Sequence, residues 1–353
     1  MVRRTLGPTL MNILLLLAHS IEEYDQVRLL SELGYDVFSI GGYIDPATPH
    51  DPKRPALPNA PRHPELRAVV DGLGTSDNLR HAKERIPDDL IDWADAIIVH
   101  HYEHAWIVPQ WDRIKRKRVI WRTVGQSVEG NERMMAPLRS EGLQIVRYSP
   151  KERNIPGYAG EDALIRFYKD PDEWGGWTGD EAHVLNITQH LAQREPYTNY
   201  GFWEAVTRSL PHRAAGPGSE AIAGAGEMTF GQMKASLQAA RAYLYTGTQP
   251  ASYTLGLIEA MMTGIPVVSI GPSWMRIFPY GSLLFEGHEI VSSRTDDWHW
   301  QPWSDDPAEA RDKLSALLSS KSYAQEQSKV QRARAIELFG KDKIAAEWAA
   351  FLG

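Results

Sequence analysis

The stretch 243–271, YLYTGTQPASYTLGLIEAMMTGIPVVSIG, decides the fold of this chain. It begins with a short apolar run that predicts a buried strand, followed by a loop over 246–253 that is rich in Thr, Gly, Pro and Ser. A helix follows and ends at Gly264 and Pro266, and the apolar run 267–270 indicates the next buried strand. Strand, helix and strand in this order form a βαβ unit, which implies a parallel sheet.

The start of this helix is a candidate binding site for an anion. The first backbone N–H groups of a helix have no partner within the helix, and the positive end of the helix dipole lies there, so phosphate is the usual ligand. Glu259 lies about one turn into the helix. Its carboxylate could reach the hydroxyls of a ribose whose phosphates lie at the helix start. The alternative is an ordinary βαβ unit with a surface Glu.

This segment resembles the donor-binding segment of GT-B glycosyltransferases, especially family 4 and its relatives. In that family it runs Glu, any residue, Phe, Gly, four residues, Glu-Ala, and then a small residue and Gly-x-Pro-Val-Val. Here Tyr253 stands at the Phe position, Thr254 at the Gly position, and Glu259 with Ala260 at the second Glu-Ala. The resemblance implies that Glu259 binds the ribose. The first Glu, which contacts the donor sugar in the family, is replaced by Ala251.

Strands alternate with helices along both halves of the chain, which is typical of α/β proteins with parallel sheets. The resemblance implies the GT-B fold, in which two Rossmann-like domains face each other across a cleft and a C-terminal helix crosses back to the first domain. It covers most of residues 180–353, and over 12–150 it holds only at the level of the fold. We therefore predict an N-terminal extension at 1–10, an acceptor domain at 11–165, a nucleotide-sugar donor domain at 166–340 and a C-terminal helix at 341–353.

Composition excludes several classes of function. The 353 residues suffice for two domains, and the net charge of −7 argues against nucleic acid as a partner. The absence of Cys excludes disulfides, thiolate catalysis and Cys-ligated metals. No apolar run approaches the ~20 residues that span a bilayer. The run 11–18 predicts a first strand rather than a signal peptide, so we expect a cytoplasmic protein.

A basic run at 112–118 leaves two interpretations open. Most such runs are solvated helix ends. The alternative is contact with an anionic acceptor or with a membrane surface, which would make the protein a peripheral membrane protein.

The loop after the predicted strand 184–187 is the first candidate part of a donor site. Its fixed cation is Arg194, and we predict that Arg194 stabilises the charge that develops on a leaving diphosphate. The alternative is a solvated surface Arg. In the family a Lys follows, and its position falls at or near Asn199, so one charge is missing; His190 could supply a partial charge.

Other loops of the second half complete the predicted donor site. The turn at 216–220 contains two Gly residues, which indicates either a close approach of the backbone to a ligand or a plain turn. In the family the next loop holds the base through main-chain groups, and the helix start described above binds the diphosphate. The predicted donor contacts are Gly216, Gly218, Ser219, Met228, Thr229, Ser252, Tyr253, Thr254, Leu255 and Glu259.

The first half is the predicted acceptor side. His19 and Arg122 each end a predicted strand, and His101 follows another, so all three are expected at the carboxyl edge of the sheet. With Arg194 they form the predicted catalytic set. His100, His101, Glu103 and His104 could suggest a metal site, but they follow a strand end instead of showing helical spacing, so we predict no metal.

The resemblance implies a metal-independent glycosyltransferase of the hexosyltransferase type, which moves a sugar from a nucleotide-sugar donor to a carbohydrate or other hydroxyl acceptor. The resemblance implies retention of configuration, and we expect a UDP-sugar rather than a GDP-sugar, without a bound cofactor. Two alternatives stay open. One is a nucleotide-sugar 2-epimerase on the same fold. The other is a catalytically weak nucleotide-sugar-binding protein, which Ala251 and the missing Lys would suit.

Overall fold

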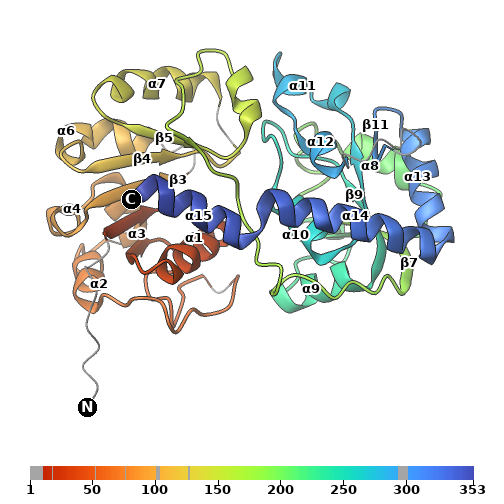
Figure 1. Cartoon of the computed structure of the whole chain (residues 1–353), viewed down its shortest axis with the longest axis horizontal. Coiled ribbons are helices and arrows are strands. Elements are labelled where there is room, and N and C mark those ends of the chain that lie inside the picture. Colours follow the sequence, from red (N-terminus) through yellow and green to blue (C-terminus); the bar gives the residue numbers. More distant parts are fainter. Residues whose placement is uncertain are drawn as a thin grey trace. The chain divides into compact units, whose positions relative to one another are not determined.

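The computed structural model describes residues 11–17, 19–51, 53–75, 77–100, 104–125, 128–292 and 301–353. The chain divides into two compact units (Figure 1). Unit 1 takes the chain up to Tyr148 together with 157–165 and 345–353, and unit 2 takes 149–156 and 166–344. The predicted extension at 1–10 lies outside the described residues. The predicted domain boundaries at 165/166 and 340/341 stay predictions.

Unit 1 is built around a six-stranded parallel sheet with the order β2-β1-β3-β4-β5-β6. The middle residues of its central strands are apolar, and all five residues of β3 are buried, as expected for strands that are covered on both faces. The strands are β1 Asn12–Leu16, β2 Asp36–Ile40, β3 Ala96–His100, β4 Arg118–Arg122, β5 Gln144–Arg147 and β6 Ala163–Leu164.

Helices cover the sheet of unit 1 and complete its core (Figure 1). Apolar side chains of the strands, such as Leu14 and Ile97, pack with Leu66, Ile107 and Met135 in one buried cluster. The helices are α1 Ser20–Glu32, α2 Pro64–Asp71, α3 Asn78–Glu84, α4 Asp88–Trp93, α5 His104–Ile107, α6 Trp111–Ile114 and α7 Glu129–Ser140.

Unit 2 has a five-stranded parallel sheet with the order β11-β10-β9-β7-β8. Its strands are β7 Glu181–Ile187, β8 His212–Ala215, β9 Ala240–Tyr245, β10 Val267–Ile270 and β11 Trp303–Ser304. Its helices are α8 Tyr200–Thr207, α9 Phe230–Ala239, α10 Leu255–Thr263, α11 Gly281–Leu284, α12 Gly287–Val291, α13 Pro307–Ser319 and α14 Lys321–Phe339.

The βαβ unit predicted from 243–271 is present as β9, α10 and β10. Thr254 is extended, with φ −118°, so the helix begins directly after it. The N–H of Gly264 donates to the carbonyl of Ala260 at the helix end, and Pro266 leads into β10, which pairs in parallel with β9. The structure therefore confirms the local prediction that decides the α/β class.

The C-terminal helix α15 (Lys341–Leu352) passes from unit 2 to unit 1, because its residues from Ala345 onward belong to unit 1. There the guanidinium of Arg118 donates to the carbonyls of Phe351 (2.6 Å) and Leu352 (2.7 Å) and lies over the Phe351 ring. An Arg at the last carbonyls of a helix satisfies acceptors that have no partner within the helix. Arg118 thus holds the C-terminal end of α15 against the sheet of unit 1.

Three cations of the basic run at 112–118 are paired with carboxylates within unit 1. Arg113 pairs with Asp88 at 2.7 Å, and Lys115 lies 2.6 Å from Asp112. Arg116 pairs with the carboxylate of Asp92. These ion pairs favour the interpretation of solvated helix ends over contact with a membrane surface. Among the described residues, the helices are all too short or too polar to cross a membrane.

Candidate functional site

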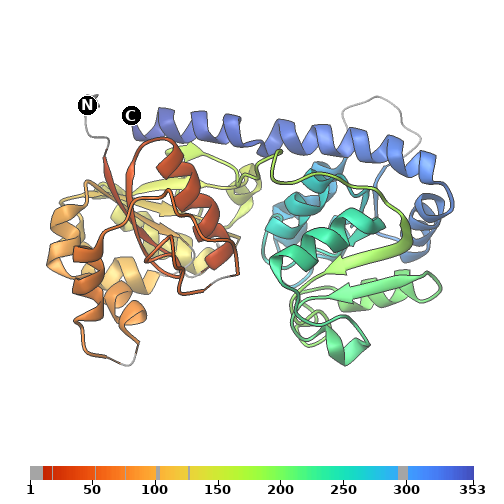
Figure 2. The same cartoon turned by 90° about the horizontal axis from the view of Figure 1, so that it is seen from below.

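The loops that carry the predicted donor contacts all leave the carboxyl edge of the unit 2 sheet, where ligands bind in open parallel sheets. Figure 2 shows the two green strands β7 and β8 running side by side toward this edge. The loops follow β7, β8 and β9 and cover residues 188–199, 216–229 and 246–254.

The start of α10 lies beside the end of β7. The hydroxyl of Tyr243 accepts a hydrogen bond from the N–H of Ile187 at 3.2 Å, and it lies 3.9 Å from where a Cβ on Gly256 would be. The hydroxyl of Thr254 does not cap the helix. Leu255 is half-buried at the first helical position. The first turn of α10 therefore presents backbone N–H groups at the edge of the sheet.

Two predicted contacts just before this turn are packed into unit 2. Tyr253 is buried, with its ring against Phe167 and Phe339 at centroid distances of 5.8 and 5.4 Å. Ser252 is also buried, and its carbonyl accepts the N–H of Glu286 at 2.9 Å. These residues hold the loop before α10, so any contact they make with a ligand would come from the backbone.

Glu259 is not a surface residue, so the alternative of a surface Glu is wrong. Its side chain is 5% exposed, and Oε1 lies 2.8 Å from Nζ of Lys169, whose side chain is 1% exposed. Sequence reasoning missed Lys169, because the two residues lie far apart in the chain and no local pattern links them. The predicted ribose carboxylate is therefore one half of a buried ion pair.

The loop after β7 carries the predicted cation on its outside. The side chain of Arg194 is exposed, while its N–H donates to the carbonyl of His190. Asn199, at the position of the family's Lys, is buried; its amide donates to the carbonyl of Thr246 at 2.8 Å and accepts from Gln249. Asn199 thus ties the loop after β7 to the loop after β9, whereas the side chain of Arg194 is exposed to solvent.

The glycines after β8 serve the packing of two loops. Gly216 and Gly218 have φ of 106° and 81°, which L side chains rarely adopt. A Cβ on Gly216 would lie 3.0 Å from the carbonyl oxygen of Thr188, and one on Gly218 would lie 2.5 Å from Nδ1 of His190. The loop after β7 thus occupies the space that a Cβ at either glycine would take, and the predicted contact of these glycines with a ligand stays a prediction.

Ser219 and Thr229 shape the loop before α9. The buried hydroxyl of Ser219 accepts the N–H of Gly226 at 2.9 Å. Thr229 forms a capping box with Gln232, so its N–H, its hydroxyl and its carbonyl are all engaged in starting the helix. Met228 is half-buried and lies just before this cap. Of the two residues predicted to hold a base through main-chain groups, Met228 is the better placed.

Unit 1 has a cavity of about 410 Å³ at the carboxyl ends of β1 and β2. The ammonium of Lys83 donates to the carbonyl of Leu17 at 3.1 Å and lies 4.8 Å from the centre of the Trp106 ring. The lining residues are Leu17, Ser20, Glu23, Gly41, Gly42, His50, Asp51, Asp77, Leu79, Arg80, Lys83 and Trp106. None of them was predicted, because they come from four separate stretches of the chain.

Glu23 is the buried carboxylate of this cavity. It accepts hydrogen bonds from the hydroxyl of Ser39 (2.5 Å) and from the N–H groups of Gly42 (2.7 Å) and Tyr43 (2.9 Å). Burial raises the pKa of Glu23, and these hydrogen bonds and the charge of Lys83 act in the opposite direction. Glu23 thus fixes the loop after β2 and places a polar group in the cavity wall.

The predicted residues of unit 1 lie elsewhere at the same edge. His19 is the N-cap of α1, and its Nδ1 lies 3.5 Å from the N–H of Glu22. Arg122 is 1% exposed, with its guanidinium 5.8 Å from the ring centre of Trp348 on α15. His101 and Glu103 lie outside the described residues. Within the described ranges, no group of three or more His, Cys, Asp or Glu could hold a metal ion.

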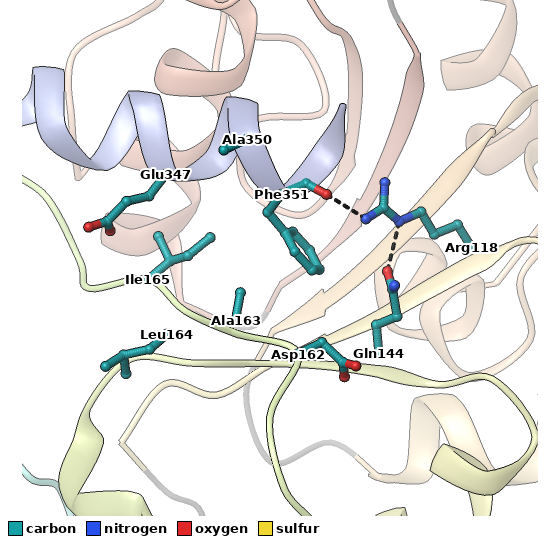
Figure 3. A pocket seen from close by; sticks show the side chains of 9 residues that line it. All are labelled: Arg118, Gln144, Asp162, Ala163, Leu164, Ile165, Glu347, Ala350 and Phe351. Atoms are coloured by element: carbon teal, nitrogen blue, oxygen red, sulfur yellow. Dashed lines mark hydrogen bonds between the residues drawn. The ribbon is translucent and has the colours of Figure 1, made fainter.

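A larger cavity of about 560 Å³ lies at the other edge of the same sheet (Figure 3). Arg118 and Gln144, which line it, are the first residues of β4 and β5, and Phe351 closes it from α15. Arg118 is already engaged with Gln144 and with the helix end. Because substrates of open parallel sheets bind at the carboxyl edge, this cavity is not the candidate site.

The sequence matches no family model and no curated protein. Solved structures resemble the chain over nearly its whole length. HepE of Anabaena in complex with UDP-glucose has a TM-score of 0.65 at 13% identity, over 97% of this chain and 99% of that chain. Sucrose-phosphate synthase from Thermosynechococcus elongatus has a TM-score of 0.64 at 13% identity, over 96% and 98%. A glycosyltransferase from Rickettsia africae has a TM-score of 0.63 at 10% identity, over 98% of each chain.

These likenesses show the fold. They confirm the predicted GT-B fold, with two Rossmann-like units and a C-terminal helix whose last residues belong to the first unit.

Proposed function

We propose that this protein is a glycosyltransferase that uses a UDP-sugar as its donor. The observation that carries the proposal is the buried carboxylate of Glu259 one turn from the start of α10, at the carboxyl edge of a GT-B unit. The bound UDP-glucose of HepE, at this low identity, supports UDP as the first nucleotide to test.

In the proposed donor site each part of the nucleotide has a partner on unit 2. The diphosphate lies at the first turn of α10, where N–H groups and the helix dipole favour an anion. Glu259 accepts hydrogen bonds from the ribose hydroxyls. The exposed Arg194 reaches the outer phosphate, and the backbone at Met228 contacts the base.

The proposed acceptor site is the unit 1 cavity of about 410 Å³. This volume falls within the ~300–1,000 Å³ of small-molecule sites and suits about one sugar ring. Its wall offers both donors and acceptors, with Lys83 and Arg80 against Asp51 and Asp77. This mixture of hydrogen-bond donors and acceptors suits the hydroxyl groups of a carbohydrate better than it suits an apolar acceptor or an anionic one. We therefore propose a carbohydrate or another polyhydroxylated acceptor.

The proposed reaction needs no base from the protein. The bond between the anomeric carbon and the diphosphate breaks, and the acceptor oxygen bonds to the same face of that carbon, so the configuration is retained. The acceptor proton passes to the departing diphosphate. Arg194 and the N–H groups of α10 stabilise the charge that develops there, which also makes a metal unnecessary.

One observation favours a second candidate, a nucleotide-sugar-binding protein with weak turnover. Ala251 offers no carboxylate to the donor sugar, and Asn199 is a buried loop contact rather than a cation. A protein with these two changes could keep nucleotide binding and lose rate.

The experiment is a thermal-shift panel with UDP, GDP, ADP and their sugars, followed by analysis of the products with the stabilising donor. A ligand that binds only the folded state raises the melting temperature. Transfer to a carbohydrate supports the proposal, whereas UDP-sugar binding without turnover favours the binding protein and isomerisation at C2 favours an epimerase. No stabilisation by any uridine nucleotide contradicts the proposed donor.

A further inference from the structure

The proposed ribose carboxylate has a partner that no local pattern reveals, and its surroundings give that partner a role. Lys169 is 1% exposed, although its ammonium is the kind of strongly hydrated charge that is rarely buried unless it is paired. Its Nζ lies 2.8 Å from Oε1 of Glu259. Two opposite charges at this distance in a buried place hold each other in the ionised form.

The backbone of Lys169 is fixed from another direction. Its N–H donates to the carbonyl of Phe339 at 3.0 Å, and Lys169 pairs with Gly340 in an isolated parallel bridge. The neighbouring Asp170 accepts from Lys341 at 2.8 Å. The segment at 169–170 is thus tied to the chain at 339–341, so Lys169 starts from a defined position.

The ammonium group of Lys169 also lies near an aromatic ring. Its Nζ lies 5.4 Å from the ring centre of Trp174, a cation–π distance. Trp174 is buried and meets the ring of Phe230 edge-on at 5.7 Å, at the first residue of α9. Lys169 therefore stands between the start of α9 and the second turn of α10, where it reaches Glu259.

We propose that Lys169 is a positioning residue of the donor site, which keeps the Glu259 carboxylate ionised and oriented for the ribose hydroxyls. Lys169 acts through Glu259 and does not touch the nucleotide. This inference rests on the proposed function, because it requires a nucleotide whose ribose meets Glu259. It also predicts that the loss of Lys169 weakens the binding of the ribose hydroxyls and leaves the binding of the base and of the phosphates unchanged.

The test compares UDP with 2′,3′-dideoxy-UDP, which lacks both ribose hydroxyls, by isothermal titration calorimetry. A hydrogen bond to a charged acceptor corresponds to a preference of the wild type for UDP of about tenfold or more. In Lys169→Met this preference should fall to about twofold or less, while the affinity for dideoxy-UDP changes little. Lys341→Met is the matched control, because it breaks an ion pair of the same 2.8 Å length on the neighbouring residue and should leave the preference intact.

A second pair of variants keeps the test valid if Lys169→Met does not fold. Lys169→Met combined with Glu259→Gln leaves no lone buried charge and should bind UDP as Glu259→Gln alone does. Weaker UDP binding by the double variant would mean that Lys169 contacts the nucleotide itself, and the positioning role would be wrong. Equal losses for UDP and dideoxy-UDP in Lys169→Met would overturn it as well.

Failure of the proposed function is distinguishable from failure of this inference. If the wild type binds neither nucleotide, the donor site is wrong and Lys169 loses its role with it. If the wild type prefers UDP and Lys169→Met keeps the full preference, the donor site stands and only the role of Lys169 is rejected.

Discussion

Unit 1 and unit 2 each carry a candidate site at the carboxyl edge of a parallel sheet, and the two sites are built differently. In unit 2 the main feature is backbone: the start of α10 after a short loop, with one carboxylate on its second turn. In unit 1 the cavity is lined by side chains from separate stretches, such as Glu23, Lys83 and Trp106. A phosphate site can be made by one continuous segment, whereas a site for hydroxyl groups needs donors and acceptors gathered from several.

The same contrast appears in how each lysine is held. Lys169 is almost fully buried against Glu259, whereas Lys83 is only partly buried and meets a carbonyl and the face of a ring. The candidate site of unit 2 thus contains a buried ion pair, whereas the charge of Lys83 in unit 1 lies close to solvent. The predictions below test this difference.

The largest effect is expected for the stability of Lys169→Met. Removing one partner of a buried ion pair leaves an uncompensated charge, so the free energy of unfolding should fall by about 3–5 kcal/mol. Lys83→Met should lose less, about 1 kcal/mol, because Lys83 is partly solvated and its hydrogen bond to Leu17 goes to a neutral carbonyl. Urea unfolding followed by tryptophan fluorescence measures both. Similar losses of stability in the two variants would mean that the two lysines are held in the same way.

A change in acceptor affinity should follow from Lys83→Met. If the unit 1 cavity binds the acceptor, the KM for the acceptor should rise about tenfold, since a charged hydrogen-bond donor is lost. The Kd for UDP should stay the same, because Lys83 belongs to unit 1. Lys115→Met, which removes an exposed ion pair outside the cavity, is the control. Equal KM values for the wild type and Lys83→Met would place the acceptor elsewhere.

Gly218→Ala tests whether the loops at the unit 2 edge are locked together. The new Cβ would lie 2.5 Å from Nδ1 of His190 at a φ of 81°, so we expect a loss of about 1–3 kcal/mol. Gly130→Ala is the matched change in unit 1, in helix α7 with no atom near the new Cβ, and should gain about 0.4–1 kcal/mol. Chemical denaturation gives both values. A neutral Gly218→Ala would mean that the two loops move apart easily.

A smaller effect concerns acid. Burial lowers the pKa of His288, which stacks on Phe285 and meets Trp303 edge-on. Both folded and unfolded forms are neutral above the ordinary pKa of 6.5, and below it the unfolded chain takes up the proton first. The stability of the wild type should therefore fall as the pH drops below about 6.5, and His288→Phe should reduce that fall. Parallel stability curves for the two proteins between pH 7.5 and 5.5 (roughly one unit either side of the ordinary His value) would contradict a neutral His288.

Local sequence was enough for the α/β fold and for the strand and helix that carry the proposed donor site. The stretch 243–271 determines a strand, a helix start and a turn through residues that are near neighbours, so its structure is predictable from propensity and pattern. The place where α10 begins is also determined by residues close to it in the sequence. For this reason the position of Glu259 at the carboxyl edge could be predicted.

The parts that escaped prediction depend on long-range contacts. Lys169 meets Glu259 only because the segment at 169–170 is tied to 339–341, and Lys83 reaches Leu17 across the sheet edge. Arg122 ends β4 as expected, and its predicted contact with a ligand stays a prediction; its neighbour Trp348 on α15 is one that no local pattern indicates. Periodicity and spacing give the place of a residue along a strand or helix, and they carry no information about which distant side chain lies next to it.

The measurement that tests the central claim most directly is calorimetric titration of UDP into the wild type and into Glu259→Gln. Glu259→Gln keeps the shape of the side chain and removes the charge that the ribose hydroxyls would meet. We predict that UDP binds the wild type and that its Kd rises by about 10- to 150-fold in the variant, which corresponds to ~1.5–3 kcal/mol. An unchanged Kd in a folded Glu259→Gln, or no binding of UDP to the wild type, would contradict a donor site at α10.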